Sequence, residues 1–326
     1  APGKHWVMML AVGQEMQIYS SGNLKVWKKE SSFGAMQGAH GGVWECPDLI
    51  ELPIEGTELK KWVLVCNLNP GGPFGGSATQ YFVGTFDGKR FVNESPAVTK
   101  WMDWGKDHYA TVTWSDAPDN RRIAIAWMSN WQYANDVPTS QYRSPNSVPR
   151  DLGLFTVGGE TYLQSAPSPE LQKLRDISKK RSFRVNGTRT VKEMIPVNEG
   201  AYEIELSIKN LHADVIGFRL YNDKGEEVDM QYDMKENRFS MDRRKSGDVG
   251  FNENFPALTW TAVESGKNEL KLHLFVDKSS VEAFGDGGRF AMTNQVFPSE
   301  PYNHIDFYSK GGAYKVDSFI VYRLKQ

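Results

Sequence analysis

Cysteine and histidine are scarce in this sequence. Among 326 residues there are two cysteines, Cys46 and Cys66, and six histidines. Two cysteines exclude a disulfide framework, so we expect both to be free or buried thiols. The scattered histidines form no ligand cluster of recognisable spacing with them. We therefore expect no metal site and no cofactor.

An excess of one charge and a long hydrophobic run are also missing. The 38 basic residues nearly balance the 40 acidic ones, and no basic block stands out. Nucleic acid and anionic membranes are therefore poor partners. No apolar run approaches the roughly 18 residues of a membrane span, and we recognise no signal peptide. The chain enters a strand directly after Ala-Pro-Gly-Lys, as a piece of a longer protein would. The missing signal therefore does not define its compartment.

Tryptophan, in contrast, is abundant and unevenly distributed. Nine of the ten tryptophans lie within the first 131 residues, and only Trp260 lies later. This shift in composition favours two domains of different character, which the chain length also favours. Aromatic faces can stack on the C–H faces of sugar rings, although the same side chains commonly fill a β core.

The first half of the chain reads as short β-strands. They are rich in β-branched and aromatic residues and are bounded by Gly, Asn, Asp or Pro. We expect strands at 5–13, 15–21, 62–69, 79–86, 108–115 and 122–129. The Asp-Gly pair in "FDGKRF" (86–91) predicts a hairpin. Repeated short antiparallel strands indicate a propeller, a sandwich or a barrel.

The middle of the chain predicts a short helical linker. In "QSAPSPELQKLRDIS" (164–178), Ser168 can cap a helix and Pro169 suits its first position. From about residue 180 alternating strands resume, with a Gly-rich hairpin at 285–288, which indicates a β-sandwich. We therefore divide the chain into a first domain, a linker and a second domain at residues 1–165, 166–178 and 179–326.

The stretch "GAHGGVWECPDLIELP" contains the first candidate for chemistry, Glu45. A general acid needs a raised pKa, which burial beside an apolar group such as Trp44 supplies. Gly41 and Gly42 would leave backbone room for a ligand. The alternative is a structural glutamate at the end of a strand.

Two further segments contain candidate residues. In "WMDWGKDHYATVTW" (101–114), Asp103 and Lys106 can lie on one loop and polarise a neighbouring carboxyl group, or form an exposed turn ahead of a strand. The loop within 126–152 includes Asn130 and Trp131, a polar-aromatic pair suited to sugar hydroxyls and ring faces. It exceeds 15 residues, and loops of that length are more often functional than not.

These segments, in this order, resemble glycoside hydrolase family 32, the β-fructosidases, which include invertases, inulinases and levanases. "HGGVWECPDLIELP" resembles the family's Glu-Cys segment, and "DWGKDHYA" its Asp-aromatic-Gly element. "WMSNWQYANDVPTSQYRSPNSVPRDL" is similar to the form found in exo-acting inulinases and levanases. "NPGGPFGGSATQYFVGTFDGKRF" and "LFVDKSSVEAFGDGGRFAMTNQVFP" resemble a strand pair and the C-terminal sandwich. The resemblance covers nearly the whole chain.

The resemblance implies an all-β fold, a five-bladed β-propeller followed by a β-sandwich. It also implies release of fructose from levan, inulin or sucrose by a retaining mechanism, with two carboxylates about 5–5.5 Å apart, and a secreted or periplasmic location. Glu45 would be the general acid/base, tuned by Asp103 and Lys106. The substrate-binding residues that we carry over or infer are Trp131, Asn130, Trp44, Gln80 and Tyr81.

Two motifs of the family are absent from this chain. Its nucleophile lies in Trp-Met-Asn-Asp-Pro-Asn-Gly and its transition-state stabiliser in Arg-Asp-Pro, but the sequence contains no Asp-Pro pair. We therefore expect a partial propeller that lacks about two blades, has no nucleophile and turns over little alone. Missing blades would expose a sheet face, which we expect to be covered by a homodimer partner or by an N-terminal segment.

Three functions are compatible with these features. The chain can be part of an exo-acting β-fructosidase, a non-catalytic fructan-binding protein, or a fructosyltransferase that uses a sugar acceptor in place of water. The sequence leaves these alternatives open.

Overall fold

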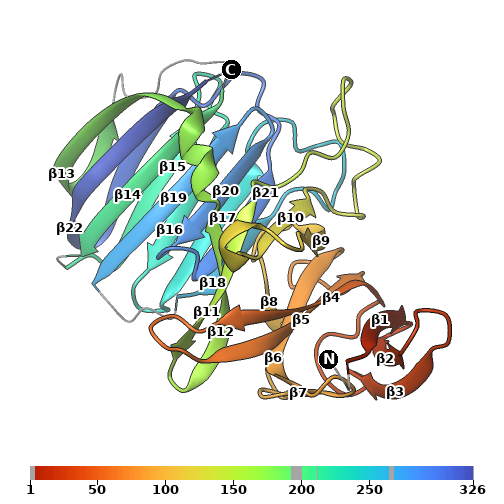
Figure 1. Ribbon diagram of the computed structural model, residues 1–326. Coiled ribbons are helices and arrows are strands. Elements are labelled where there is room, and N and C mark those ends of the chain that lie inside the picture. The colour runs from red at the N-terminus through yellow and green to blue at the C-terminus, as the bar shows by residue number, and fades with distance from the viewer. Residues whose placement is uncertain (1–3, 192–199, 211, 264–267, 326) are drawn as a thin grey trace.

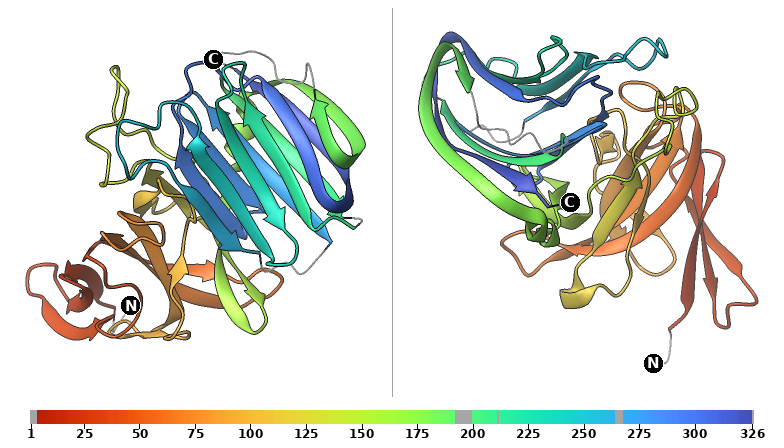
Figure 2. Two further views of the ribbon diagram at one scale, coloured as in Figure 1. Left: turned by 180° about the vertical axis from the view of Figure 1, so that it is seen from behind. Right: turned by 90° about the horizontal axis from the view of Figure 1, so that it is seen from above.

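The structure is a computed structural model that describes residues 4–191, 200–210, 212–263 and 268–325, and it consists almost entirely of β-strands (Figure 1). Two parts follow each other along the chain. Residues up to Pro167 form three antiparallel sheets, and residues from Arg175 form one large sheet folded into two layers. Figure 2 shows the three sheets beside the layered part. The all-β class predicted from the sequence is confirmed.

The first part consists of three sheets in chain order. The first sheet contains β1 (Trp6–Val12), β2 (Glu15–Ser21) and β3 (Lys28–Phe33). The second contains β4 (Val43–Pro53), β5 (Lys60–Asn69), β6 (Ala78–Phe86), β7 (Phe91–Asn93) and β8 (Lys100–Trp101). The third contains β9 (Tyr109–Thr113), β10 (Ile123–Trp127), β11 (Arg150–Val157) and β12 (Glu160–Pro167), with a short 3₁₀ turn, η1 (Pro118–Asn120).

The three sheets pack face to face, and the alternation of side chains along β6 shows why. Ala78 and Phe82 enter the core between the first and second sheets, whereas Tyr81 and Val83 enter the core between the second and third. Both faces of β6 are therefore apolar, as expected for a strand covered on two sides. The predicted hairpin at 86–91 is also confirmed, because Phe86 pairs with Phe91.

The second part is a sandwich built from one continuous sheet. Its strands are β13 (Arg175–Val191), β14 (Tyr202–Asn210), β15 (Val215–Tyr221), β16 (Glu227–Asp233), β17 (Arg238–Lys245), β18 (Leu258–Ala262), β19 (Glu269–Asp277), β20 (Ser280–Gly285), β21 (Phe290–Gln295) and β22 (His304–Leu324). The long strand β22 serves both layers, because residues 304–310 pair with β15 and residues 314–323 pair with β14. The passage between them contains Gly311 and Gly312, where a Cβ would collide with Asp214 and His212.

The connection between the two parts is shorter than the sequence suggests. It is a 3₁₀ helix, η2 (Pro169–Leu174), with Pro169 at its start as predicted. Ser168 precedes the helix, but its side chain does not cap it. The Ser168 hydroxyl instead donates to Asp151, 2.6 Å away. Ser168 therefore occupies the predicted N-cap position of a short 3₁₀ helix, but its hydroxyl binds a neighbouring carboxylate and makes no hydrogen bond to the helix.

The edge strand β21 is one of the places where the sandwich contacts the first part. The backbone N–H groups of Trp104 and Asp107 donate to Ala291 O and Thr293 O at 2.8 and 3.0 Å. The loop ahead of β9 therefore covers the edge of β21, which would otherwise expose unpaired backbone groups.

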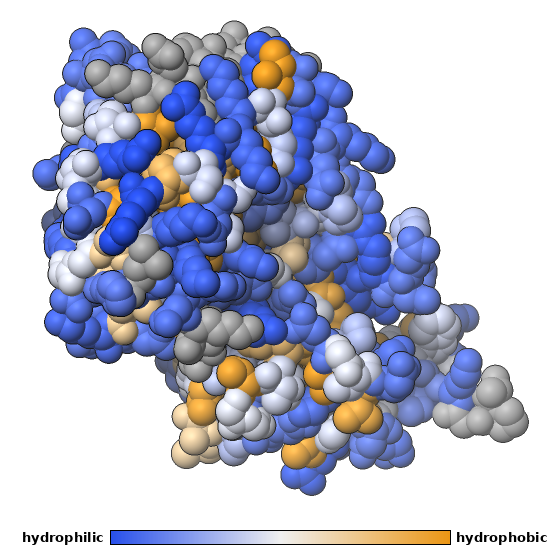
Figure 3. Space-filling model, turned by 90° about the vertical axis from the view of Figure 1, so that its left-hand side faces the viewer, coloured by the Kyte–Doolittle hydropathy of each residue, from blue (hydrophilic) through white to orange (hydrophobic). Residues whose placement is uncertain are grey.

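The outer surface of the sandwich is hydrophilic over β13, where most side chains are exposed. On the face that Figure 3 shows, hydrophobic residues occur singly or in small groups among hydrophilic ones. Within the described residues, no helix has the length and apolar character that a membrane crossing requires.

Candidate functional site

Glu45 lies at the beginning of β4, next to an irregularity in the strand. Glu45 pairs with Asn67 of β5, but the next regular pair joins Asp48 to Val65, so Cys46 and Pro47 together oppose a single residue. This is a β-bulge, and Cys46 has a φ of 42° that non-glycine residues rarely adopt. Bulges redirect side chains and are enriched beside active sites. The Glu45 side chain is exposed.

Tyr109, the first residue of β9, is the side chain that contacts Glu45. Its hydroxyl donates a hydrogen bond to Glu45 Oε2. Burial and the hydrogen bond to Glu45 both raise the pKa of Tyr109, so its hydroxyl keeps its proton at neutral pH. β4 and β9 belong to different sheets that meet here (Figure 1). The contact therefore depends on how the sheets pack against each other.

An aromatic row continues from Tyr109 to the surface. Tyr109 is opposite Trp127 of β10, and their ring centroids are 6.2 Å apart. Trp127 in turn packs against Trp131, with centroids 4.9 Å apart. Trp131 is 51% exposed, so one face of this row is open to a ligand. A carboxyl group, a hydroxyl donor and an exposed indole thus belong to one chain of contacts, with Trp127 between the hydroxyl donor and the exposed indole.

This arrangement suits acid/base chemistry on a sugar. A carboxyl group held by one hydrogen-bond donor can give and take a proton. Indole rings provide flat apolar surfaces of the kind that sugar C–H groups contact. Glu45 and Trp131 were predicted from the sequence, whereas Tyr109 and Trp127 were not. The available signal was a single aromatic residue at the end of each of two strands, Tyr109 at the start of β9 and Trp127 at the end of β10.

Asp103 lies away from Glu45, at the boundary with the sandwich. Its carboxylate accepts hydrogen bonds from Arg150 Nη1 at 2.8 Å and from the Thr293 hydroxyl at 2.7 Å. Burial alone would raise the pKa of Asp103, but the Arg150 guanidinium and these hydrogen bonds hold it below its ordinary value. Arg150 also donates to Glu282 of β20, so Asp103 belongs to a buried ionic network.

Lys106 also faces the sandwich. Its ammonium group donates to Asn254 O, and its backbone N–H donates to Asn294 Oδ1 at 3.1 Å. Burial, with the nearby Arg243, lowers the pKa of Lys106 to about 8. Both side chains hold the loop ahead of Tyr109 onto the sandwich, and Tyr109 itself contacts the carboxyl group. The tuning of Glu45 by Asp103 and Lys106 stays a prediction.

Trp44 and Gln80 are core residues in this structure. The Trp44 indole is 1% exposed and donates to Ala39 O at 2.9 Å. Gln80 is fully buried and its Oε1 accepts from Ala39 N at 2.8 Å. Neither side chain is accessible to a sugar, contrary to the expectation from sequence, because both face the core between the first two sheets.

Gly41 and Gly42 do not open space for a ligand. A Cβ on Gly42 would lie 2.3 Å from the carbonyl carbon of Asn69, and one on Gly41 would lie 2.5 Å from Gly71 Cα. The two glycines therefore allow the approach of the chain at 69–71, which corrects the role expected from the sequence.

Asn130 organises the loop that precedes Trp131. Its side-chain N–H₂ donates to Gly75 O at 3.1 Å and to Lys106 O at 2.9 Å. Its Oδ1 accepts from the backbone N–H of Ser77 at 3.3 Å. The residue is fully buried, so it fixes three segments around Trp131 and is not placed to contact a sugar itself.

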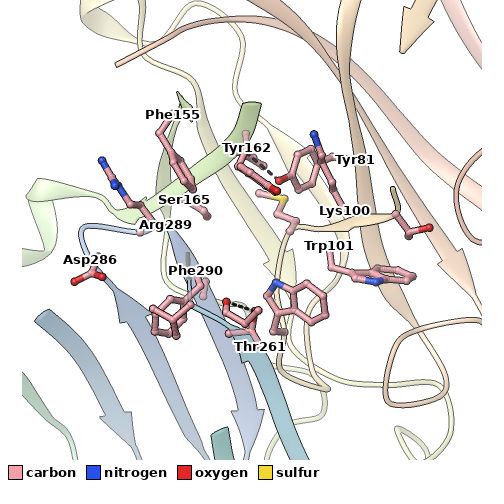
Figure 4. A pocket seen from close by; sticks show the side chains of 18 of the residues that line it. Tyr81, Lys100, Trp101, Phe155, Tyr162, Ser165, Thr261, Asp286, Arg289 and Phe290 are labelled. Atoms are coloured by element: carbon pink, nitrogen blue, oxygen red, sulfur yellow. Dashed lines mark hydrogen bonds between the residues drawn. The ribbon is translucent and has the colours of Figure 1, made fainter. Parts of the chain in front are cut away.

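Tyr81 lines a different hollow, at the seam between the third sheet and the sandwich (Figure 4). This cavity has a volume of about 280 Å³. Tyr81, Tyr162 and Phe155 approach it from one side and Phe290 and Thr261 from the other. Glu45, Tyr109, Trp127 and Trp131 are not among the lining residues. Tyr81 is therefore separated from the candidate acid/base.

One group of possible metal ligands lies in the sandwich. Glu203, Glu205 and His273 each place one ligand atom within 4.8 Å of the others. Arg175 donates to both carboxylates, so a guanidinium already neutralises them. We therefore assign the group to an ion-pair network. This group was not predicted from the sequence, because Glu203 and Glu205 of β14 meet His273 of β19 only in the folded sheet.

Comparison with known proteins places these features in a family. The family model described as "Glycosyl hydrolases family 32 N-terminal domain" matches residues 2–167, and "Glycosyl hydrolases family 32 C terminal" matches residues 170–323. The chain belongs to glycoside hydrolase family 32. The resemblance inferred from the sequence motifs is confirmed.

Relatives of this family 32 chain include fructan-degrading enzymes. It is 41% identical to a levanase of Bacillus subtilis over 330 residues, covering 99% of this chain and 49% of the levanase. It is 36% identical to an extracellular exo-inulinase of Aspergillus awamori, covering 94% of this chain and 60% of that protein. The chain therefore spans only about half of these curated relatives.

Solved structures agree with the fold. The crystal structure of the exo-inulinase from Aspergillus awamori matches with a TM-score of 0.88 and 32% identity, covering 100% of this chain and 65% of that one. A β-fructofuranosidase from Schwanniomyces occidentalis, complexed with fructosyl-erythritol, matches with a TM-score of 0.85 and 29% identity, covering 99% of this chain and 68% of that one. The fold is thus part of a five-bladed β-propeller followed by a β-sandwich, as the sequence resemblance implied.

Proposed function

We propose that this chain forms part of a β-fructosidase that releases fructose from β-fructans by a retaining mechanism, with Glu45 as general acid/base. The observation that carries the proposal is the hydrogen bond from Tyr109 to Glu45, together with the aromatic row from Tyr109 through Trp127 to the exposed ring of Trp131, in a member of family 32. These groups supply a proton donor and an apolar platform in one row of contacts.

In this proposal Glu45 acts twice. It first protonates the oxygen that leaves the fructosyl group, and it then takes a proton from the water that releases fructose. Tyr109 holds the carboxyl group in position for both steps, because its hydroxyl keeps its own proton. Trp131 packs against the fructosyl ring, supported from behind by Trp127.

A retaining mechanism needs a second carboxylate as nucleophile, about 5–5.5 Å from the first. We propose that the nucleophile lies outside the 326 residues, because the family's Asp-Pro motif does not occur in them. The chain alone is then expected to show little or no turnover.

The substrate class follows from the named relatives. A levanase and an exo-inulinase are among the matched proteins, which supports levan and inulin, with sucrose as a shorter alternative. The word "extracellular" in the exo-inulinase names supports a secreted or periplasmic location. Binding of fructan without cleavage is the second candidate function, favoured by the exposure of Trp131 in a chain without the nucleophile motif.

We also propose that the outer face of β1 is covered in the working protein. Trp6, Leu10 and Val12 alternate along this edge strand and are 57, 43 and 40% exposed. The matched solved chain of exo-inulinase is longer than this one, which supports further propeller sheets as the covering element.

The test is complementation. The chain is joined in frame to the part of the Bacillus subtilis levanase that precedes the matched region, and fructose release is measured from levan, inulin and sucrose. We expect release from at least one fructan by the joined protein and little from the chain alone. Absence of release, together with fructan binding by calorimetry that survives Glu45→Gln and is lost in Trp131→Ala, would support the binding protein instead.

A further inference from the structure

Two loops of the propeller lead to Tyr109 and carry Trp131, and both make contacts with the sandwich. Residues 102–108 lead directly into Tyr109 at the start of β9. The loop after β10 carries Trp131. Asp107 lies two residues before Tyr109, and Tyr133 lies two residues after Trp131. Whatever fixes Asp107 and Tyr133 therefore also limits where Tyr109 and Trp131 can lie.

A single guanidinium from the sandwich contacts both loops. Arg243 of β17 donates from Nη1 to Asp107 Oδ2 and from Nη2 to the Tyr133 hydroxyl at 2.8 Å. The Tyr133 hydroxyl donates to the other carboxylate oxygen of Asp107 at 2.6 Å. The three side chains form a closed triangle that spans 136 residues of sequence.

The three side chains of this triangle are buried, and Asp107 and Arg243 make further hydrogen bonds. The Asp107 and Arg243 side chains are both 0% exposed. Arg243 Nε donates to Phe255 O at 2.8 Å, and its guanidinium lies 4.0 Å from the centre of the Phe255 ring. The backbone N–H of Gln295 donates to Asp107 Oδ2 at 2.8 Å. Because each partner is satisfied only in this arrangement, displacement of one loop would leave a buried charge unpaired.

We propose that Arg243 is a positioning residue for the candidate active site, acting through Asp107 on Tyr109 and through Tyr133 on Trp131. The sandwich then contributes to the site by fixing its two loops relative to each other. The proposal rests on the proposed function for its kinetic consequences, whereas its structural consequence can be measured without any activity.

The variant Arg243→Lys separates positioning from simple packing. A lysine keeps the charge opposite Asp107 but lacks the planar fork that reaches Asp107 and Tyr133 at once. The matched control is Arg289→Lys, because Arg289 pairs with Glu55 across the same boundary at 2.9 Å and does not contact either loop.

The first measurement is backbone hydrogen exchange on the 326-residue chain. We expect Arg243→Lys to exchange faster in peptides covering 103–109 and 130–137, with the sandwich strands β14 and β19 unchanged and Arg289→Lys like the parent. Unchanged protection in both loops would overturn the proposal. An equal loss of protection from exchange throughout the sandwich would also overturn the proposal, because Arg243 would then have a role in folding only.

The second measurement is kinetic and uses the joined, active protein. A misplacement of about 1 Å can reduce rates by about 100-fold, so we expect kcat/KM to fall about 10- to 100-fold in Arg243→Lys. Displacement of Trp131 raises KM and displacement of Tyr109 lowers kcat, whereas a smaller folded fraction would lower kcat at unchanged KM. A decrease in kcat alone, matched by the loss of folded protein, would contradict positioning.

If Arg243→Lys does not fold, the variant Tyr133→Phe tests the positioning of the loops instead. It removes only the hydroxyl that joins Arg243 and Asp107 and keeps the ring against Phe255, whose centroid is 5.2 Å away. We expect faster exchange within 130–137 and a several-fold rise in KM, and unchanged values of both would overturn the proposal. If the joined parent protein releases no fructose, the proposed function fails, and the exchange experiment still decides on the positioning of the loops.

Discussion

At the scale of single residues, the proposed acid/base chemistry depends on Glu45 and Tyr109. They are 64 residues apart in the sequence and are joined by one hydrogen bond in the fold. Glu45 is exposed, so its setting differs from that of an acid enclosed in an apolar pocket. The Tyr109 hydroxyl is therefore the protein group that orients the carboxyl group, and the substrate would supply the remaining contacts.

Tyr109→Phe tests this contact. It removes the donor to Glu45 and keeps the ring against Trp127. We expect kcat of the joined protein to fall about 10- to 100-fold with little change in KM, because orientation of the acid/base affects the chemical step more than substrate binding. Trp131→Ala is the contrasting variant, with a larger effect on KM. An unchanged kcat in Tyr109→Phe would show that the contact has no part in catalysis.

Lys106 provides a prediction on pH and stability. Its pKa is lowered to about 8 by burial and Arg243, so the unfolded chain binds more protons between pH 8 and the ordinary lysine value of 10.5. Its charge therefore destabilises the fold fully below pH 8, and this effect disappears above about pH 10.5. We expect Lys106→Met to raise the unfolding free energy by about 1–2 kcal/mol at pH 7, after loss of one hydrogen bond.

The measurement is the midpoint of thermal unfolding of Lys106→Met and the parent chain at pH 7 and pH 10. The increase in midpoint of Lys106→Met over the parent chain should be smaller at pH 10 than at pH 7. An increase that is equal at both pH values, or larger at pH 10, would contradict the predicted destabilising effect of the Lys106 charge.

The sequence predicted which residues have suitable side chains, but not the directions in which these side chains point. Glu45 and Trp131 were identified from motif context, and in the structure they are linked through Tyr109 and Trp127. Asp103 and Lys106 were expected near Glu45 because the family resemblance implies that they tune it. Their side chains point to the sandwich instead, because their partners Thr293 and Asn254 lie more than 140 residues downstream.

At the scale of elements, the bulge in β4 is the feature that sets the direction of Glu45. A strand without the extra residue would shift the ladder by one position, and such a shift turns side chains to the opposite face. Alternating apolar residues and turn signals predicted six of the twelve strands of the first part and the hairpins at 86–91 and 285–288. They did not predict β3, β4, β7, β8, β11 or β12. Pro47 in "WECPD" indicates an interruption of the strand, because proline donates no ladder hydrogen bond. It does not show that Cys46 and Pro47 together oppose a single residue.

Cys46→Val tests the bulge. A β-branched residue does not tolerate the φ of 42° at this position, so we expect a loss of about 1–2 kcal/mol and a lower thermal midpoint. Cys46→Gly is the matched variant, because glycine adopts positive φ without strain and should unfold at or above the temperature of the parent. Equal midpoints for the two variants would argue against a strained bulge.

At the scale of the whole molecule, the propeller sheets and the sandwich form a single unit through their buried ionic contacts. Length and the uneven tryptophan content predicted two parts, and the motif resemblance predicted their folds. The interface itself was not predictable, because Arg150–Glu282 and Arg243–Asp107 join residues 132 and 136 positions apart. Such pairs leave no local pattern.

The apolar outer face of β1 provides a prediction at this scale. We expect the isolated chain to self-associate, because Trp6 and Leu10 are exposed on an edge strand. The double variant Trp6→Lys, Leu10→Lys should be monomeric by light scattering, and Trp114→Lys, which changes a tryptophan that is 47% exposed elsewhere, should associate like the parent. A parent chain that is already a stable monomer would contradict the prediction.

The most direct test of the account compares Glu45→Gln with the parent in the joined, active protein. Loss of a general acid/base is expected to lower kcat about 100- to 10,000-fold. Because the nucleophile is untouched, added azide should restore turnover of a fructoside with a good leaving group and yield a β-fructosyl azide, without a proton from residue 45. Activity of Glu45→Gln close to that of the parent, or a loss that azide does not restore, would contradict the assignment of Glu45 as the acid/base.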